Sequence, residues 1–244
     1  MKIAVLGGTG LIGSRVVKRL EAAGHEAVAL SKSTGVDLLT GEGLAPALEG
    51  ADAVVDVTNS PTFDEASSAF FRTTTEHLLA AAREQGVGHV VLLSIVGVDQ
   101  VPGLDYYRAK VLQEDMVKAG PVPYSIIRAT QFFEFVDDIM SWSADEETVR
   151  LPRTRVQPIA AADVAQAVAE AAVGHPFRGT DDIAGADVFP LDELGRVTLA
   201  ARGDRRTVTT DDTAGMFAAV PEDAIIAGPD VRIAPTRYRD WLAG

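Results

Sequence analysis

Three side chains that can donate protons or bind an oxygen anion lie close together in the sequence. Ser94 ends an apolar run, Tyr106 follows twelve residues later, and Lys110 lies four residues beyond Tyr106. Positions i and i+4 share one face of a helix, so we expect Tyr106 and Lys110 to be neighbours. A phenol with a pKa of about 10 is a poor acid at neutral pH, but a nearby ammonium group lowers that pKa. The spacing therefore predicts general acid chemistry at a carbonyl, with Tyr106 as proton donor, Lys110 as its partner and Ser94 as a hydrogen-bond donor.

A glycine-rich turn near the N-terminus predicts a phosphate-binding element. The segment 7–13, Gly-Gly-Thr-Gly-Leu-Ile-Gly, follows a short apolar run and opens a helical pattern. Gly7 permits a tight turn, Gly10 lets backbone N–H groups approach a pyrophosphate, and Gly13 allows the helix to pack closely on the strand. The N-terminus of the helix then faces the anion. We therefore predict a dinucleotide site formed by Gly7, Thr9, Gly10, Leu11, Ile12 and Gly13.

The end of the second apolar run bears on which dinucleotide binds. An acidic residue there would hold the ribose 2′-hydroxyl of NAD, but the sequence has Ser31, Lys32 and Ser33 instead. A carboxylate would repel a 2′-phosphate, whereas a lysine flanked by hydroxyl groups neutralises and hydrogen-bonds it. We therefore predict NADP(H) in preference to NAD(H), which stays possible because a solvated loop is the alternative interpretation. Asp37, the nearby acid, is expected either beside the adenine or at the end of a turn.

Two further segments follow apolar runs at the edge where parallel sheets bind their ligands. Thr58 and Asn59 follow the run 54–57, and Lys110 is also within expected reach of the nicotinamide ribose. We predict cofactor contacts from Thr58, Asn59, Lys110, Thr130 and Gln131, and a substrate wall from Tyr107, Phe132 and Phe133. Core packing is an equal alternative for the two phenylalanines.

The elements that must position these residues alternate along the chain. Apolar runs predict strands at 3–6, 27–30, 53–57, 89–94 and 124–128, and apolar spacings of three and four residues predict helices at 11–23, 64–84 and 106–118. This order predicts a Rossmann-type, doubly wound parallel sheet with helices on both faces.

The pattern changes after Ser141. Strands are predicted near 149–151 and 156–159, a helix at 160–173, and a closing segment at 238–242 in which Trp241 is packed. We therefore predict an NAD(P)-binding core over residues 1–140 and a small C-terminal α/β substrate lobe over 141–244, packed on the core as one continuous unit.

Composition narrows the classes of partner. The chain has 244 residues and a net charge of −13, which disfavours binding to nucleic acid, and no apolar run approaches the roughly 20 residues of a membrane span. With no cysteine and four scattered histidines, neither thiolate chemistry nor a metal site is expected. The N-terminus lacks a secretory pattern, so we expect a cytoplasmic protein that acts on a small molecule. The absence of a long helical face favours a monomer.

Several motifs together resemble a known family. They are the glycine turn, the segment 93–99 (Leu-Ser-Ile-Val-Gly-Val-Asp), the Tyr106/Lys110 pair and the segment 158–165 (Pro-Ile-Ala-Ala-Ala-Asp-Val-Ala). Over nearly its full length the chain resembles atypical short-chain dehydrogenases/reductases of the NmrA-like branch. The resemblance implies that Ser94, Tyr106 and Lys110 form the catalytic set. The asparagine that many members carry on the fourth helix has no match between Phe63 and Glu84, which puts a proton relay through it in doubt.

Three functions are compatible with these features. The leading hypothesis is an NADPH-dependent oxidoreductase that reduces a small carbonyl compound or quinone by hydride transfer. The alternative is a non-catalytic, NADP-binding redox sensor that signals through a protein partner, as regulatory members of the branch do. A nucleotide-sugar epimerase ranks third, because the segment after Ser141 offers few strongly patterned elements and no basic cluster beyond 202–206.

Overall fold

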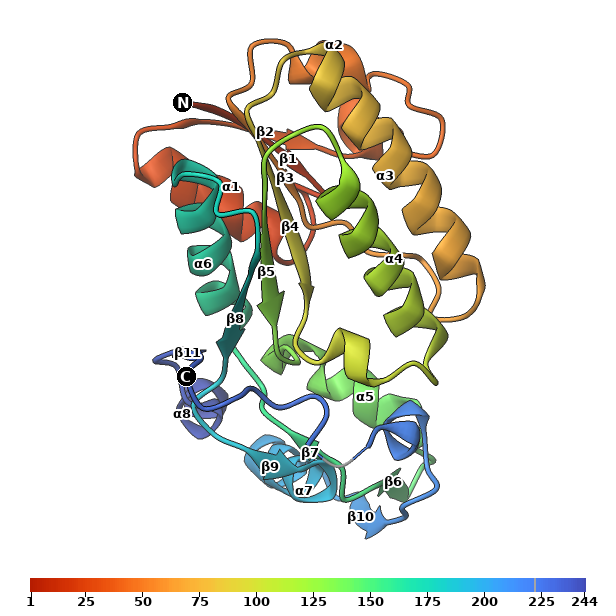
Figure 1. Ribbon diagram of the computed structural model, residues 1–244. Coiled ribbons are helices and arrows are strands. Elements are labelled where there is room, and N and C mark those ends of the chain that lie inside the picture. The colour runs from red at the N-terminus through yellow and green to blue at the C-terminus, as the bar shows by residue number, and fades with distance from the viewer. Residues whose placement is uncertain (222) are drawn as a thin grey trace. The chain divides into compact units, whose positions relative to one another are not determined.

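A seven-stranded sheet organises the fold (Figure 1). The computed structural model describes residues 1–221 and 223–244. The strands of the sheet are β1 (Lys2–Leu6), β2 (Glu26–Leu30), β3 (Ala53–Asp56), β4 (His89–Ile95), β5 (Tyr124–Ala129), β8 (Thr180–Ala184) and β11 (Arg232–Ile233). Their order is β11-β8-β5-β4-β3-β1-β2. Ile3 pairs in parallel with Ala27 and with Ala53, and Ala53 pairs in parallel with His89, so the predicted parallel sheet is confirmed.

Helices and short turns connect these strands. The helices are α1 (Gly13–Ala22), α2 (Leu44–Leu48), α3 (Ala66–Glu84), α4 (Asp105–Ala119), α5 (Val136–Ser141), α6 (Ala161–Val173), α7 (Leu191–Arg202) and α8 (Tyr238–Ala243). Four 3₁₀ turns accompany them, η1 (Lys32–Thr34), η2 (Val98–Gln100), η3 (Phe133–Phe135) and η4 (Met216–Ala219). None of the helices among the described residues is both long and apolar enough to cross a membrane.

The chain divides into two units that interleave along the sequence. Unit 1 comprises Met1–Ile95, Asp105–Arg128 and Val164–Asp181, and unit 2 comprises Val96–Leu104, Ala129–Asp163 and Asp182–Gly244. The division of the chain into residues 1–140 and 141–244 stays a prediction.

Unit 1 has a sheet covered on both faces. Helices α1 and α6 lie on one side of the strands, and α3 and α4 lie on the other (Figure 1). Every residue of β3 is buried, because a strand with helices on both faces has no solvent-exposed side. The layered arrangement confirms the doubly wound α/β fold predicted from the alternation.

Unit 2 contains two small strand pairs. β6 (Thr148–Leu151) and β10 (Thr207–Thr210) pair in parallel, and β7 (Arg155–Val156) and β9 (Phe189–Pro190) pair antiparallel. The predicted strand at 156–159 is wrong beyond Val156. Pro158 lacks the N–H group that a ladder needs, and Ile159 makes only an isolated bridge to Phe132.

The aromatic core of unit 2 explains its C-terminal helix. Tyr238 is buried, lies 4.9 Å from the ring of Phe133, and exchanges a 2.8 Å hydrogen bond with the hydroxyl of Thr198. Trp241 stacks on Tyr238 at 5.9 Å and contacts Phe133 at 5.5 Å, which confirms its predicted packing role.

Candidate functional site

The glycine turn has the geometry of a phosphate-binding loop. Gly7 adopts a φ of +75°, and a Cβ there would lie 3.1 Å from the carbonyl oxygen of Val57. A Cβ on Gly13 would overlap the carbonyl oxygen of Gly7, so Gly13 is required by the turn itself as well as by helix packing. Gly8, which sequence reasoning did not assign, is equally constrained, because its Cβ would lie 2.6 Å from the Cα of Ala29.

The helix that follows the turn offers free backbone donors. Ser14 donates to the carbonyl of Gly10 at 3.0 Å, and Val16 donates to that of Ile12 at 2.9 Å. The amides of Leu11, Ile12 and Gly13 precede these bonds, at the helix start where backbone N–H groups lack partners within the helix. Such a set of amides, with the positive end of the helix dipole, fits a pyrophosphate. Gly10 is the least crowded glycine of the three, with a Cβ meeting only the Gly7 carbonyl oxygen at 3.2 Å.

Lys32 and Ser33 lie in the 3₁₀ turn η1 after β2, and Ser31 directly precedes that turn. The hydroxyl groups of Ser31 and Ser33 lie 2.8 Å apart, and the ammonium of Lys32, 70% exposed, lies 3.1 Å from the carboxylate of Asp37. The backbone N–H of Leu39 and the ammonium of Lys32 hold the pKa of Asp37 below its usual value. Asp37, whose place the sequence left open, is therefore the partner of Lys32.

Tyr106 lies in the first turn of α4, beside the loop that follows β3. Its hydroxyl donates a hydrogen bond to Oδ1 of Asn59, and its ring lies 5.0 Å from that of Phe63 and 5.9 Å from that of Phe71. Burial, together with the neighbouring phenol of Tyr107, raises the pKa of Tyr106. The sequence predicts a lowered pKa from Lys110, but burial dominates in the structure. The phenol is therefore protonated at neutral pH, as a proton donor must be.

Lys110 is a buried cation on the same helix. Its ammonium donates to the carbonyl oxygen of Leu93 at 2.8 Å and to Oε1 of Gln113, and it lies 4.8 Å from the ring centre of Phe71. Burial lowers the pKa of Lys110 to about 8, although the charges of Asp56 and Glu114 act in the opposite direction. The hydrogen bonds of the Lys110 ammonium thus go to Leu93 and Gln113 and not to the hydroxyl of Tyr106.

The remaining predicted residues have defined places. Ser94 is buried near the end of β4, and Thr58 donates from its amide and its hydroxyl to Asp56. In unit 2, Thr130 accepts from the amide of Gly185 at 3.3 Å, and the side chain of Gln131 donates to the carbonyl of Ile225 at 3.2 Å. The cofactor contacts assigned to Thr58, Thr130 and Gln131 stay predictions.

The three residues predicted to line a substrate wall differ in exposure. Phe133 is buried in the core of unit 2, as its alternative interpretation expects, and its contact with a substrate stays a prediction. Phe132 is half-buried and stacks on Phe135 at 5.6 Å. Tyr107 is buried, and burial raises its pKa. Contact of Phe132 or Tyr107 with a substrate stays a prediction.

Sequence reasoning missed two polar residues of this region. Asp56 is the last residue of β3 and Gln113 lies on α4, and both are buried. The amide nitrogen of Gln113 donates to Oδ2 of Asp56 at 3.0 Å. Two features of the sequence could have pointed to these residues: Asp56 is a carboxylate at the end of an apolar strand, and Gln113 is an amide three residues after Lys110.

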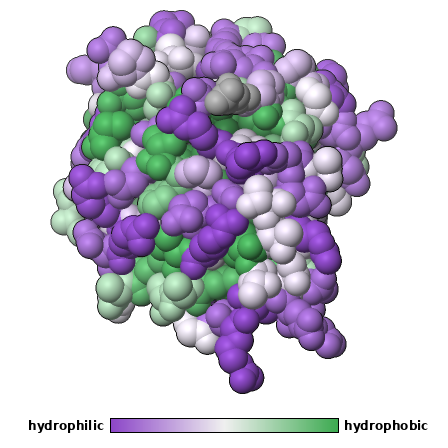
Figure 2. Space-filling model, turned by 90° about the horizontal axis from the view of Figure 1, so that it is seen from below, coloured by the Kyte–Doolittle hydropathy of each residue, from purple (hydrophilic) through white to green (hydrophobic). Residues whose placement is uncertain are grey.

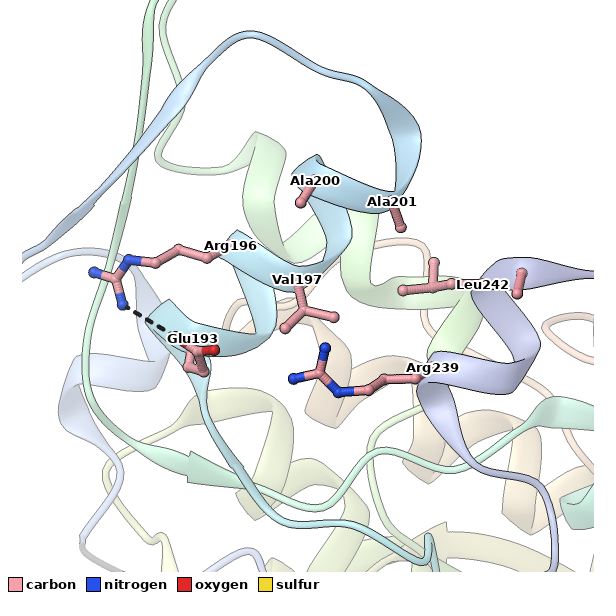
Figure 3. Close-up of a pocket in the computed structure, with 8 residues that line it drawn as sticks. Glu193, Arg196, Val197, Ala200, Ala201, Arg239 and Leu242 are labelled. Carbon is pink, nitrogen blue, oxygen red and sulfur yellow. Dashed lines mark ion pairs between the residues drawn. The ribbon is translucent and has the colours of Figure 1, made fainter.

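An open hollow lies elsewhere, on the surface of unit 2 between α7 and α8 (Figure 3). It is lined by Glu193, Arg196, Val197, Ala200, Ala201, Arg239, Leu242 and Ala243, none of which the sequence predicts to act. Arg196 pairs with Glu193 at 3.7 Å, one helical turn away on α7 (Figure 3). The face of the molecule seen from below mixes apolar areas with strongly hydrophilic ones (Figure 2). The hollow is therefore not the site predicted from the motifs.

Comparison with known proteins defines the class. A family model described as NAD(P)H-binding matches residues 7–174, which is more than half of the chain and includes the glycine turn, Tyr106 and Lys110. The chain therefore belongs to the NAD(P)H-binding family. A nicotinamide dinucleotide is accordingly its cofactor, and the glycine turn and α1 fit that group.

The curated relatives include reductases and an assembly factor. A (4-alkanoyl-5-oxo-2,5-dihydrofuran-3-yl)methyl phosphate reductase of Streptomyces griseus is 31% identical over 154 residues, covering 58% of this chain and 50% of the relative. The photosystem II assembly factor Ycf39 of Synechocystis is 25% identical over 174 residues, with coverages of 61% and 53%. A chloroplastic divinyl chlorophyllide a 8-vinyl-reductase of Cucumis sativus is 31% identical over 164 residues, with coverages of 54% and 39%. The chain thus spans about half or less of the length of these relatives.

Solved structures share the fold at low identity. A nucleoside-diphosphate-sugar epimerase of Staphylococcus aureus aligns with a TM-score of 0.77 and 15% identity, over 100% of both chains. A UDP-glucose 4-epimerase of Thermus thermophilus, solved with NAD, aligns with a TM-score of 0.71 and 18% identity, over 86% of both chains. These similarities establish a Rossmann-like fold.

Proposed function

We propose that the chain is an NADPH-dependent oxidoreductase that reduces a small carbonyl compound or a quinone by hydride transfer. The observation that carries the proposal is the pair of titratable side chains on α4. Tyr106 presents a protonated phenol at the loop after β3, and Lys110 holds a buried ammonium one helical turn away. Both lie in the unit that carries the glycine turn.

The residues that would hold the cofactor follow from the geometry. The amides of Leu11, Ile12 and Gly13 would bind the pyrophosphate, and Ser31, Lys32 and Ser33 would bind the 2′-phosphate. Within the same unit, Thr58 and Asn59 are the proposed contacts on the nicotinamide side. The bound nicotinamide supplies a hydride to the substrate.

Within this scheme the protein's own residues handle the proton. Tyr106 donates its phenolic proton to the substrate oxygen as negative charge develops there, and Ser94 donates a hydrogen bond to the same oxygen. Lys110 has three N–H donors, of which Leu93 and Gln113 accept two. The third serves the ribose hydroxyl, and the positive charge stabilises the phenolate left by proton transfer.

Asn59 can take the place of the asparagine that many members of the resembled family carry on the fourth helix. The family's asparagine on the fourth helix is missing, but Asn59, in the loop after β3, accepts the hydrogen bond of the Tyr106 hydroxyl through its side-chain amide. A side-chain amide can fix the orientation of a phenol without titrating. We propose that Asn59 aims the hydroxyl of Tyr106.

The rings around Tyr106 favour an apolar, conjugated substrate. Phe63 is 46% exposed although it packs against Tyr106, so an apolar ring lies open to solvent beside the reacting hydroxyl. A planar quinone or aryl carbonyl compound would cover this ring by offset or edge-to-face stacking.

A regulatory role is the second candidate. It is favoured by the hydrogen bonds of the Lys110 ammonium, which go to Leu93 and Gln113 and not to the phenol of Tyr106. In this case the chain would bind NADP(H) and signal its redox state to a protein partner.

One experiment separates the two candidates. The purified chain is titrated with NADPH and NADH, and NADPH consumption is then followed with a panel of quinones, ketones and aldehydes for the wild type and for Tyr106→Phe. A reductase binds NADPH tightly and turns over at least one compound, and Tyr106→Phe abolishes turnover while it preserves NADPH affinity. Tight binding without turnover on any compound would favour the regulator, and absence of dinucleotide binding would refute both.

A further inference from the structure

Lys110 carries a charge in the interior of unit 1, so its neighbours must compensate for lost hydration. The residue is buried, and the structure gives its ammonium one backbone acceptor, Leu93, and one side-chain acceptor, Gln113. An ammonium moved out of water without partners would lose its proton instead of staying charged. The state of Lys110 therefore depends on the few groups that face it.

The chemistry of the partners fixes how Gln113 is oriented. Gln113 is fully buried and lies between the ammonium of Lys110 and the carboxylate of Asp56. An ammonium only donates hydrogen bonds and a carboxylate only accepts them, so the amide must present its oxygen to Lys110 and its nitrogen to Asp56. The other orientation would set donor against donor and acceptor against acceptor.

Asp56 is held in turn by the loop that follows β3. Its Oδ1 accepts from the amide of Thr58 at 2.9 Å and from the hydroxyl of Thr58 at 2.6 Å, while its Oδ2 accepts from Gln113 at 3.0 Å. Asp56 is 2% exposed, so its negative charge is screened little by solvent. A continuous chain of hydrogen bonds thus joins Lys110 to the loop that contains Thr58 and Asn59.

We propose that Gln113 and Asp56 are positioning residues that hold the ammonium of Lys110 charged and directed for its part in the reduction. This inference rests on the proposed function and adds two residues to the machinery. Gln113 fixes the direction of the ammonium, and Asp56 supplies the opposing charge behind the amide. Neither residue touches the reacting atoms.

The charged groups around Lys110 come from three elements. Asp56 lies on β3, Glu114 lies on α4, and Arg128 on β5 forms paired hydrogen bonds of 2.8 and 2.7 Å with Glu114, while α3 contributes the ring of Phe71. Burial would raise the pKa of Glu114, but the hydrogen bonds from Arg128, Ser94 and Lys118 hold it below its ordinary value. Asp56 and Glu114 both oppose the effect of burial on the pKa of Lys110, and Asp56 contributes more, because Glu114 is also paired with Arg128.

The test measures the charge of Lys110 directly. Protein labelled with ¹³C at the lysine ε carbon is titrated by NMR, and the Lys110 signal is identified by its loss in Lys110→Met. Asp56→Asn and Gln113→Leu are each expected to lower the pKa of Lys110 by at least about one unit. Asp115→Asn removes the same charge from an exposed position of the same helix and is expected to leave that pKa unchanged.

Cofactor binding and turnover complete the test. Asp56→Asn and Gln113→Leu should weaken NADPH binding and lower kcat/KM at about pH 8, and both should recover towards wild type at about pH 6, where Lys110 regains its proton. A merely structural defect would not be repaired by acid. Should Asp56→Asn fail to fold, Thr58→Val removes the hydroxyl bond to Asp56 with a smaller perturbation, and the pKa of Lys110 is then the readout, because Thr58 is itself a proposed cofactor contact.

The outcomes separate this inference from the proposed function. An unchanged Lys110 pKa in both variants, or losses that are equal at all pH values, would overturn the positioning role. If the wild type turns over no carbonyl compound or quinone while both variants shift the pKa of Lys110 and weaken NADPH binding, the reductase function fails but the control of Lys110 by Gln113 and Asp56 stands.

Discussion

Burial acts in opposite directions on the two titratable side chains of α4. It raises the pKa of Tyr106, which stays a protonated acid, and lowers the pKa of Lys110 to about 8. The desolvated phenol can give up a proton only when a cation is close enough to stabilise the phenolate. The charge state of Lys110 is therefore the feature on which the chemistry of Tyr106 depends.

Lys110 should make the stability of the fold depend on pH. Its folded pKa of about 8 lies below the ordinary 10.5, so between these values the unfolded chain binds more protons than the folded one. The free energy of unfolding therefore rises with pH in this window. We expect urea denaturation between about pH 7.5 and 9.5 to show this rise in the wild type and a smaller rise in Lys110→Met. The window stops below about pH 10, because tyrosines whose pKa is raised by folding reverse the trend there.

Lys18→Met is the matched control for this experiment, since Lys18 is an exposed lysine of α1. It should keep the wild-type slope of unfolding free energy against pH. Equal slopes in the wild type and Lys110→Met would show that Lys110 keeps an ordinary pKa in the folded chain.

Lys32 should determine the preference for NADPH. Charge-assisted hydrogen bonds contribute about 1.5–3 kcal/mol, so Lys32→Ala should weaken NADPH binding by roughly tenfold to a hundredfold and leave NADH binding nearly unchanged. Asp37→Asn should strengthen NADPH binding, because it releases Lys32 from its ion pair and removes a charge that repels the 2′-phosphate. Fluorescence titration with both cofactors checks these changes. Parallel losses of NADPH and NADH affinity in Lys32→Ala would refute a 2′-phosphate contact.

At the scale of elements, two glycines of the same turn are required for different physical reasons. Gly13 has no room for a Cβ beside the Gly7 carbonyl, whereas a Cβ on Gly10 would meet a single atom at 3.2 Å. Gly13 is therefore required by the fold, and Gly10 by the approach of a ligand.

Substitutions by alanine should separate these roles. Gly13→Ala should lower the thermal midpoint strongly, with a cost of several kcal/mol from overpacking against the backbone. Gly10→Ala should keep a midpoint close to wild type and lose most of its NADPH affinity. Gly103→Ala, at a position with no atom near its Cβ, controls for the loss of glycine itself. A Gly10→Ala protein that binds NADPH like the wild type would remove this glycine from the cofactor site.

The sequence predicted those elements whose signal is local. The five strands β1 to β5 and helices α1, α3 and α4 follow apolar runs and helical periodicity, and the glycine turn has its own spacing. The strands β8, β9, β10 and β11 were not predicted, because β9 and β11 have only two residues each and because β8 (Thr-Asp-Asp-Ile-Ala) and β10 (Thr-Val-Thr-Thr) lack a continuous apolar run.

The same distinction explains what could be predicted of the site. Tyr106 and Lys110 share a helix, so their spacing is visible in the sequence. The contacts of Tyr106 with Asn59 and of Gln113 with Asp56 span 47 and 57 residues, and only the folded chain brings them together.

At the scale of the whole molecule, the net charge of −13 makes the binding of an anionic dinucleotide depend on local donors. The helix amides after the glycine turn and Lys32 must overcome a repulsive long-range field. Binding of NADPH should therefore stabilise the fold measurably, because the cofactor binds the folded chain only.

Thermal unfolding checks this consequence. At a hundredfold excess over Kd, a ligand adds about 2.7 kcal/mol, which for a chain of this size corresponds to a rise of roughly 5–10 °C in Tm. NADPH should give the larger shift and NADH a smaller one at equal concentration. The absence of a shift with either cofactor, at concentrations up to the millimolar range, would contradict the assignment of a dinucleotide site.

The most direct test of the central claim is isotope transfer. NADPH deuterated at C4 of the nicotinamide is incubated with the chain and a responsive quinone or carbonyl compound, and the reduced product is analysed by mass spectrometry and NMR. For a carbonyl substrate, we predict deuterium on the former carbonyl carbon with the wild type and none above background with Tyr106→Phe, although that variant still binds NADPH. Product without deuterium, or equal transfer by Tyr106→Phe, would contradict hydride transfer assisted by the phenol of Tyr106.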